Sequence, residues 1–75
     1  MRVEILGGGC ANCKKLEENV RAALAKKGVN AEVVKVTDFG EIASYGVLRT
    51  PALAIDGKVV AEGRIPSVEE IAKML

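Results

Sequence analysis

The sequence has no histidine or tryptophan, and its 75 residues include two cysteines, one phenylalanine and one tyrosine. Without histidine the chain cannot form a Cys–His hydrolase, nor complete a four-ligand cysteine and histidine zinc site by itself. The chain also has no marked excess of either charge, because eleven basic and ten acidic residues are interspersed. With no basic stripe and almost no stacking aromatics, the sequence gives no support for nucleic-acid binding.

Long apolar runs are absent as well. None approaches the ~20 residues that a membrane-spanning helix requires. The segment from Met1 to Leu6 reaches Gly7 too early to hold the apolar core of a signal peptide. We therefore expect a soluble, cytoplasmic protein with no membrane partner. The length indicates a single domain over residues 1–75, and we expect a monomer.

Apolar residues make up 49% of the chain, which is enough for a packed core. Their spacing predicts seven elements in the order β-α-β-α-β-β-α. Strands are expected at 3–6, 31–36, 52–55 and 58–61, and helices at 10–27, 39–45 and 68–75. The expected fold class is α/β, with a four-stranded mixed sheet and three helices. The first β-α-β unit should form a parallel pair of strands, and the last two strands an antiparallel hairpin.

Four local signals fix the ends of these elements. Gly28 suits the left-handed cap of the first helix. Asp38 is typical of the residue that caps a helix N-terminus, and Ser67 opens a capping box before the last helix. Asp56-Gly57 is the strongest hairpin signal in the chain.

The two cysteines, Cys10 and Cys13, form a CxxC motif at the predicted start of the first helix. A helix N-terminus stabilises an anion, so Cys10 should ionise more easily than a free cysteine. Cys13 lies on the apolar stripe of the same helix and should be buried. This asymmetry suits dithiol exchange, in which Cys10 attacks a disulfide and Cys13 resolves the mixed disulfide.

The whole chain resembles the thioredoxin superfamily, with a strand, Cys10-Ala11-Asn12-Cys13, a helix, Thr50-Pro51 before a strand, and an Asp56-Gly57 hairpin. It is most similar to the small, glutaredoxin-sized archaeal and bacterial proteins called redox-active disulfide protein 2. The resemblance implies a minimal thioredoxin-like fold. It also implies a cis peptide at Thr50-Pro51, with the Thr50 backbone presented to a substrate strand, and a substrate groove that includes Gly63.

The sequence departs from the family beside the cysteines. Gly9 stands where thioredoxins carry an aromatic residue before the first cysteine, which reduces the usual docking surface. Ala11-Asn12 replaces the Gly-Pro of thioredoxins and the Pro-Tyr of glutaredoxins. Gly9, Ala11 and Asn12 are nevertheless expected to contact substrate, and no glutathione-binding pattern is present.

Glu4 lies six residues before Cys10, the spacing at which thioredoxins carry a buried acid that exchanges a proton with the buried cysteine. If it were buried, Glu4 could take the proton of Cys13. We favour the plainer arrangement, a solvated carboxylate paired with Arg2 or Lys35.

Other loop residues have two readings each. Arg49, just before Thr50-Pro51, would favour a thiolate at Cys10 if it approached that sulfur, although loop arginines are more often simply solvated. Ile42, Val47 and Leu48 are expected to form core and groove wall, or else the docking patch that Gly9 does not supply.

These residues predict a thiol–disulfide oxidoreductase that exchanges electrons with protein disulfides and is reduced by a thioredoxin-reductase-like partner. Its redox group would be the Cys10–Cys13 disulfide, with no cofactor and no metal. The alternative is a thiolate carrier or sensor that holds Cu(I) or zinc with the same two cysteines. Metal chaperones of this size, however, have the order β-α-β-β-α-β and end on a strand, whereas this chain ends on a predicted helix.

Overall fold

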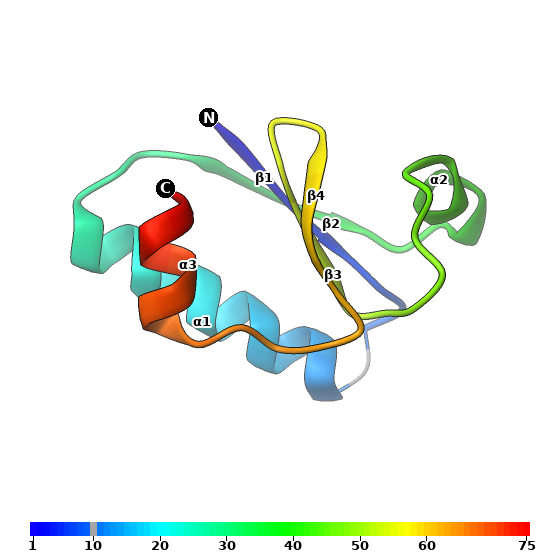
Figure 1. The fold of residues 1–75 in the computed structure, drawn as a ribbon, viewed down its shortest axis with the longest axis horizontal. Helices are drawn as coiled ribbons and strands as arrows, with labels where there is room; N and C mark the ends of the chain where they lie inside the picture. The colour runs from blue at the N-terminus through cyan, green and yellow to red at the C-terminus, as the bar shows by residue number, and fades with distance from the viewer. Residues whose placement is uncertain (10) are drawn as a thin grey trace.

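The computed structural model describes residues 1–9 and 11–75, and its elements follow the expected order (Figure 1). They are β1 (Arg2–Leu6), α1 (Ala11–Lys27), β2 (Glu32–Val36), α2 (Phe39–Ser44), β3 (Ala52–Ile55), β4 (Lys58–Glu62) and α3 (Val68–Met74). Among the described residues, each predicted end lies within one residue of the observed one. The predicted start of the first helix at Cys10 lies outside the described residues.

The four strands form one mixed sheet in the order β2-β1-β3-β4. As predicted, β1 and β2 are parallel, and β3 and β4 form an antiparallel hairpin. The hairpin turns at Asp56 and Gly57, whose φ angles of 51° and 84° are those that Asp-Gly turns adopt. β1 and β3 are antiparallel, with Val3 opposite Ile55 and Leu6 opposite Ala52. The two central strands are therefore β1 and β3.

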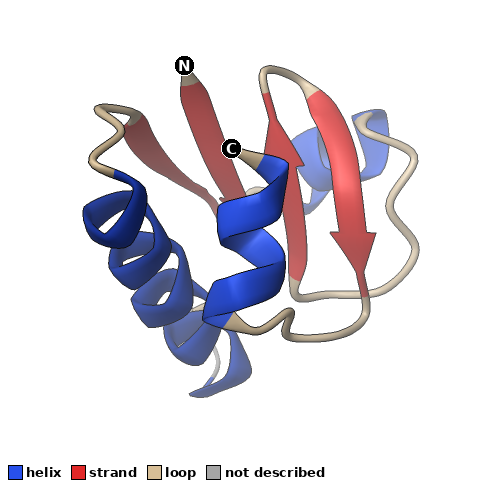
Figure 2. Ribbon diagram, turned by 60° about the vertical axis from the view of Figure 1, so that its left-hand side comes forward, coloured by secondary structure: helices blue, strands red, loops and turns tan. Residues whose placement is uncertain are grey.

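Helices cover both faces of the sheet, with α1 and α3 on one face and α2 on the other (Figure 2). Strand residues alternate between the two faces. The larger core, between the sheet and α1 with α3, consists of Val3, Ile5, Leu16, Val20, Ala23, Leu24, Leu53, Ala61, Ile71 and Ala72. The smaller core, on the α2 face, consists of Leu6, Val36, Ile42, Val47, Ala52 and Ala54.

The predicted helix ends are present. Gly28 has a φ of 65° and follows α1 in the left-handed conformation. The Asp38 side chain accepts a hydrogen bond from the Gly40 backbone at 2.8 Å and begins α2. Ser67 and Glu70 form a complete capping box at the start of α3. No helix in the described part of the chain has the length and apolar character needed to cross a membrane.

Candidate active site

Cys13 lies in the first turn of α1 and is only 5% exposed. Its Sγ atom packs against the backbone of Gly7, because a Cβ atom placed on Gly7 would overlap it. The same Cβ position lies 3.8 Å from the Cα atom of Pro51. Gly7, the first residue after β1, thus brings the buried thiol and Pro51 together, which only a residue without a side chain allows.

The Thr50–Pro51 peptide bond is cis. Pro51 is buried, and its carbonyl accepts a hydrogen bond from the Gly63 backbone at 2.9 Å. Gly63 has a φ of 68°, and a Cβ atom there would lie 3.0 Å from the Cβ atom of Arg49. The structure therefore gathers four residues singled out in the sequence, Arg49, Thr50, Pro51 and Gly63. Arg49 packs over Gly63, and its predicted approach to Cys10 involves a residue outside the described ones.

Glu62, which the sequence did not single out, holds the loop before Pro51. Its Oε2 atom accepts hydrogen bonds from the backbone of Leu48 at 2.6 Å and of Arg49 at 3.1 Å. Bonds from two backbone donors to one carboxylate are charge-assisted and stronger than neutral ones. Because Glu62 is the last residue of β4, the loop is tied directly to the sheet. No local motif marks this contact in the sequence, since it joins residues 13 and 14 positions apart.

The residues that flank the cysteines are exposed. Gly9, Ala11 and Asn12 all face solvent, as a substrate-binding surface requires. Gly9 has a φ of 80°, in the left-handed region where large side chains are disfavoured. An aromatic residue at this position would be strained in the observed backbone.

Glu4 is buried, which corrects the expectation of a solvated carboxylate. It is 3% exposed and is the one buried charged residue among those described. The Tyr45 hydroxyl donates a hydrogen bond to its Oε2 atom, and Arg2 lies 3.9 Å from the same oxygen. This bond, together with burial, raises the pKa of Tyr45 above its usual value of 10.0. The expected partner Arg2 is present, but Lys35 is not a partner of Glu4.

Strand alternation explains why Lys35 and Cys13 are both separated from Glu4. Glu4 shares the α2 face of the sheet with Leu6, and its partner Tyr45 packs beside that core. Cys13 and Lys35 lie on the opposite face, where they line one pocket with Ile5. The proton acceptor suggested by the family spacing therefore points away from the buried thiol.

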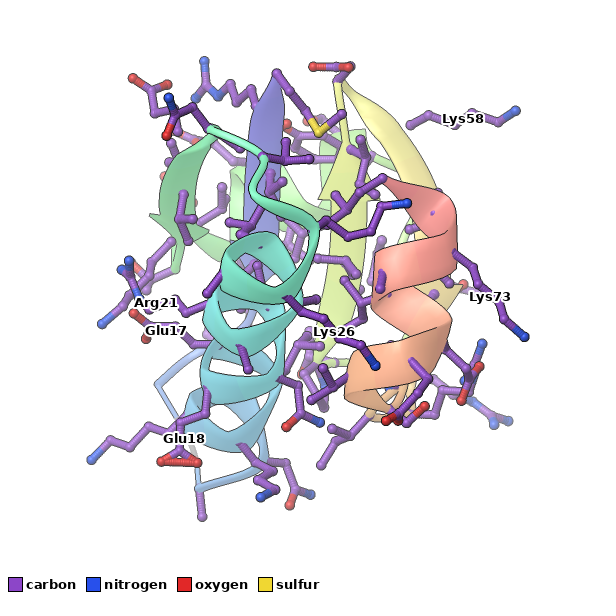
Figure 3. All side chains as sticks on the ribbon, turned by 90° about the vertical axis from the view of Figure 1, so that its left-hand side faces the viewer. Glu17, Glu18, Arg21, Lys26, Lys58 and Lys73 are labelled. Atoms are coloured by element: carbon purple, nitrogen blue, oxygen red, sulfur yellow. The ribbon has the colours of Figure 1, made fainter. Side chains whose placement is uncertain are left out.

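A pocket with a volume of about 60 Å³ opens on Cys13 between α1, β1 and β2. It is lined by Ile5, Gly7, Gly9, Cys13, Lys14, Glu17, Lys35 and Thr37. Glu17 binds Lys35 at 3.1 Å and Arg21 at 2.9 Å. Hydrogen bonds from Lys35, which has the larger effect, and from Arg21 lower the pKa of Glu17 below its usual 4.5. Glu17 and Arg21 extend from the side of α1 that faces away from α3 (Figure 3).

Two large apolar side chains near the site are exposed. Leu48 is 92% exposed, so it is not a core residue and is placed as the alternative expectation of a docking patch requires, whereas Ile42 and Val47 are buried as core residues. Phe39 is 74% exposed, and its ring lies 3.9 Å from the Cβ position of Gly8. Sequence reasoning missed Phe39, although it is the chain's single phenylalanine.

The alternative function, a metal carrier or sensor, would need ligands for the ion. Within them, no three histidine, cysteine, aspartate or glutamate side chains are grouped closely enough to hold an ion. Cys10 lies outside the described residues.

Comparison with known proteins gives matches over nearly the whole chain. Residues 1–75 match the family described as thioredoxin domain. The chain is 49% identical over 73 residues to a thioredoxin of Methanocaldococcus jannaschii, covering 97% of this chain and 84% of that protein. It is 43% identical over 75 residues to a thioredoxin of Methanothermobacter thermautotrophicus, covering 100% of this chain and 97% of that protein.

Proposed function

The chain belongs to the thioredoxin family, and from this we propose that it reduces protein disulfides through the dithiol Cys10 and Cys13. The observation that carries the proposal is the position of Cys13, buried against Gly7 and next to the cis peptide at Pro51. A buried second thiol is protected from outside disulfides but can reach a neighbouring sulfur one turn away. Cys13 thus suits the resolving step better than the attacking one.

Cys10 is the attacking thiol in this proposal. It directly precedes α1 in the chain, and a helix N-terminus stabilises a thiolate. The Cys10 thiolate attacks one sulfur of a protein disulfide, forming a mixed disulfide and releasing the partner's first thiolate. Cys13 then attacks Cys10, which forms the Cys10–Cys13 disulfide and releases the partner in its dithiol form. Both electrons come from the protein's two thiols, so the cycle uses no cofactor.

The substrate would lie across the backbone of Thr50, which is an exposed residue, and the surface around it. Gly9, Ala11, Asn12 and Gly63 are exposed around the site, and the protruding side chains of Phe39 and Leu48 supply apolar contact area at its edge. The partners of this cycle are protein disulfides and a thioredoxin-reductase-like enzyme that regenerates the dithiol. We place the cycle in the cytoplasm, with the protein acting as a monomer.

A trapping experiment tests the two roles. In the Cys13→Ser variant, Cys10 should hold disulfide partners as stable mixed disulfides, detected by non-reducing electrophoresis and mass spectrometry. The matched variant Cys10→Ser should trap none. Equal trapping by both variants would show that the roles are not divided in this way.

A second assay separates the redox function from metal carriage. The reduced protein is offered Cu(I) or Zn(II) in one vessel, and a disulfide substrate with a regenerating reductase in another. We expect continuous disulfide turnover. Stoichiometric tight metal binding without turnover would replace the proposal with the carrier function.

A further inference from the structure

The pocket on Cys13 contains a carboxylate, Glu17, which lies outside the family spacing that pointed to Glu4. Cys13 is nearly inaccessible, and a cysteine thiol, with an ordinary pKa of about 8.5, is mostly protonated at neutral pH. The thiol must therefore lose a proton before it can attack Cys10. Glu4, the acid at the family's spacing, lies on the other face of the sheet. A side chain that accepts this proton would have to lie on the α1 face, where Cys13 lines the pocket.

The residues that line the pocket limit which side chain could accept the proton of Cys13. Its charged lining residues among those described are Lys14 and Glu17 from α1 and Lys35 from β2, while β1 contributes Ile5 and no titratable group. Both lysines are proton donors when charged. Glu17 is thus the one described carboxylate of the pocket. It stands four residues after Cys13 on α1, so the two Cβ atoms are roughly 5–6 Å apart on one face of the helix.

We propose that the Glu17 carboxylate accepts the proton of the Cys13 thiol when Cys13 resolves the mixed disulfide. This role rests on the oxidoreductase function proposed above. The proton passes from Sγ of Cys13 to Glu17, and the Cys13 thiolate attacks the Cys10 sulfur. The Cys10–Cys13 bond forms as the bond from Cys10 to the partner sulfur breaks. The partner leaves as a thiolate and takes up a proton from solvent, to which Glu17 returns the one it received.

The ion pairs of Glu17 keep its carboxylate ionised, so Glu17 would hold the proton of Cys13 only briefly. Lys35 and Arg21 hold the pKa of Glu17 below its usual range, so the carboxylate is ionised and ready to accept at neutral pH. The equilibrium for proton transfer from an ordinary thiol to this carboxylate then favours the thiol by a factor of at least about 10⁴. The frequency factor for a barrierless step is about 6 × 10¹² s⁻¹, so a rate reduced by this factor is still far above a typical kcat.

The test uses the reduced full-length protein and 5,5′-dithiobis(2-nitrobenzoate). Attack by Cys10 releases one thionitrobenzoate, and attack by Cys13 on the mixed disulfide releases the second. In Glu17→Gln the first release should keep its rate, while the second should slow at least about tenfold at pH 6 to 7. Near pH 10 the two proteins should converge, because hydroxide then removes the thiol proton directly.

Three further variants exclude a merely structural effect. Glu17→Asp keeps a carboxylate and should recover part of the lost rate. Lys35→Met removes one ion pair but leaves the acceptor, and because Lys35 lowers the pKa of Glu17, its loss makes Glu17 a stronger base. The second release of this variant should therefore not slow. Glu18→Gln changes an exposed neighbour that does not line the pocket and should leave both releases unaltered.

Two results would overturn the assignment. An unchanged or faster second release in Glu17→Gln would show that Glu17 takes no proton, as would equal slowing in Lys35→Met. Failure of the oxidoreductase function looks different, because the wild-type protein itself would then not release the second thionitrobenzoate.

Discussion

At the scale of single residues, the contact of Gly7 with Cys13 gives the sharpest prediction. Gly7→Ala places a methyl group where the Sγ atom lies, and overpacking of this kind typically costs about 1–3 kcal/mol. Urea unfolding should show this loss, and the rate of the resolving step should change as Cys13 is displaced. Gly8→Ala is the matched control, since its nearest neighbour is the Phe39 ring at 3.9 Å. Equal stability of both variants would disprove the close contact.

Tyr45 gives a prediction with a defined direction in pH. Its hydrogen bond to Glu4 requires the protonated phenol, and its pKa is raised above 10.0 in the fold. A raised folded pKa means that the stabilisation is complete below the unfolded value and is lost as pH rises through the folded value. The stability advantage of the wild type over Tyr45→Phe should therefore shrink above pH 10.

Phenolate absorbance measures this pKa directly, because Tyr45 is the chain's one tyrosine and there is no tryptophan. The folded protein should titrate above the same protein in denaturant. A folded midpoint at or below the denatured one would contradict the Glu4–Tyr45 bond.

Residue patterns located the thiol but not its neighbours. The apolar stripe of α1 correctly predicts that Cys13 is buried, because helical spacing alone decides which face it occupies. Glu4 could not be placed in the same way. Its burial depends on α2 covering the second face and on Tyr45 reaching it from 41 residues away. Contacts of this range have no local signature.

At the scale of elements, caps and turns made the secondary structure predictable. Asp38, Ser67 and Asp56-Gly57 are local signals whose hydrogen bonds form within a few residues, so their sequence is sufficient. The loop before Pro51 is different, because Glu62 at the end of β4 holds it. Its conformation follows from the pairing of β3 with β4, which brings Ala52 opposite Glu62.

Glu62 should therefore control the order of residues 48–50. In Glu62→Ala the amides of Leu48 and Arg49 lose their acceptor, and amide hydrogen exchange there should accelerate about two- to tenfold, as a net hydrogen-bond contribution of this kind implies. The exchange of β1 and β3 amides should not change. Glu41→Ala, an exposed glutamate of α2, is the control. Unaltered exchange at both loop amides would mean that the loop is ordered without Glu62.

At the scale of the whole molecule, the chain carries two cores on a sheet of four strands. The order of elements and the parallel first pair followed from the pattern, while the central place of β3 did not. That place depends on β3 pairing with β1 at the edge opposite β2. The same arrangement puts Gly7 beside both Cys13 and Pro51. The site is thus a product of the topology, even though both motifs can be read in the sequence.

One substitution at two positions separates fold from surface. A chain of 75 residues has a total stability of about 4–11 kcal/mol. Leu16→Ala, fully buried in the larger core, should cost about 2–5 kcal/mol, because it removes packing and leaves a cavity. Leu48→Ala, at 92% exposure, should change stability by about 0.5 kcal/mol or less. Urea unfolding measures both.

Because Leu48→Ala should stay folded, its activity tests the docking surface. Slower turnover of a protein disulfide, with an unchanged rate for a small disulfide, would show that Leu48 contacts the protein substrate. A large stability loss at Leu48 would instead show that its side chain is packed in solution.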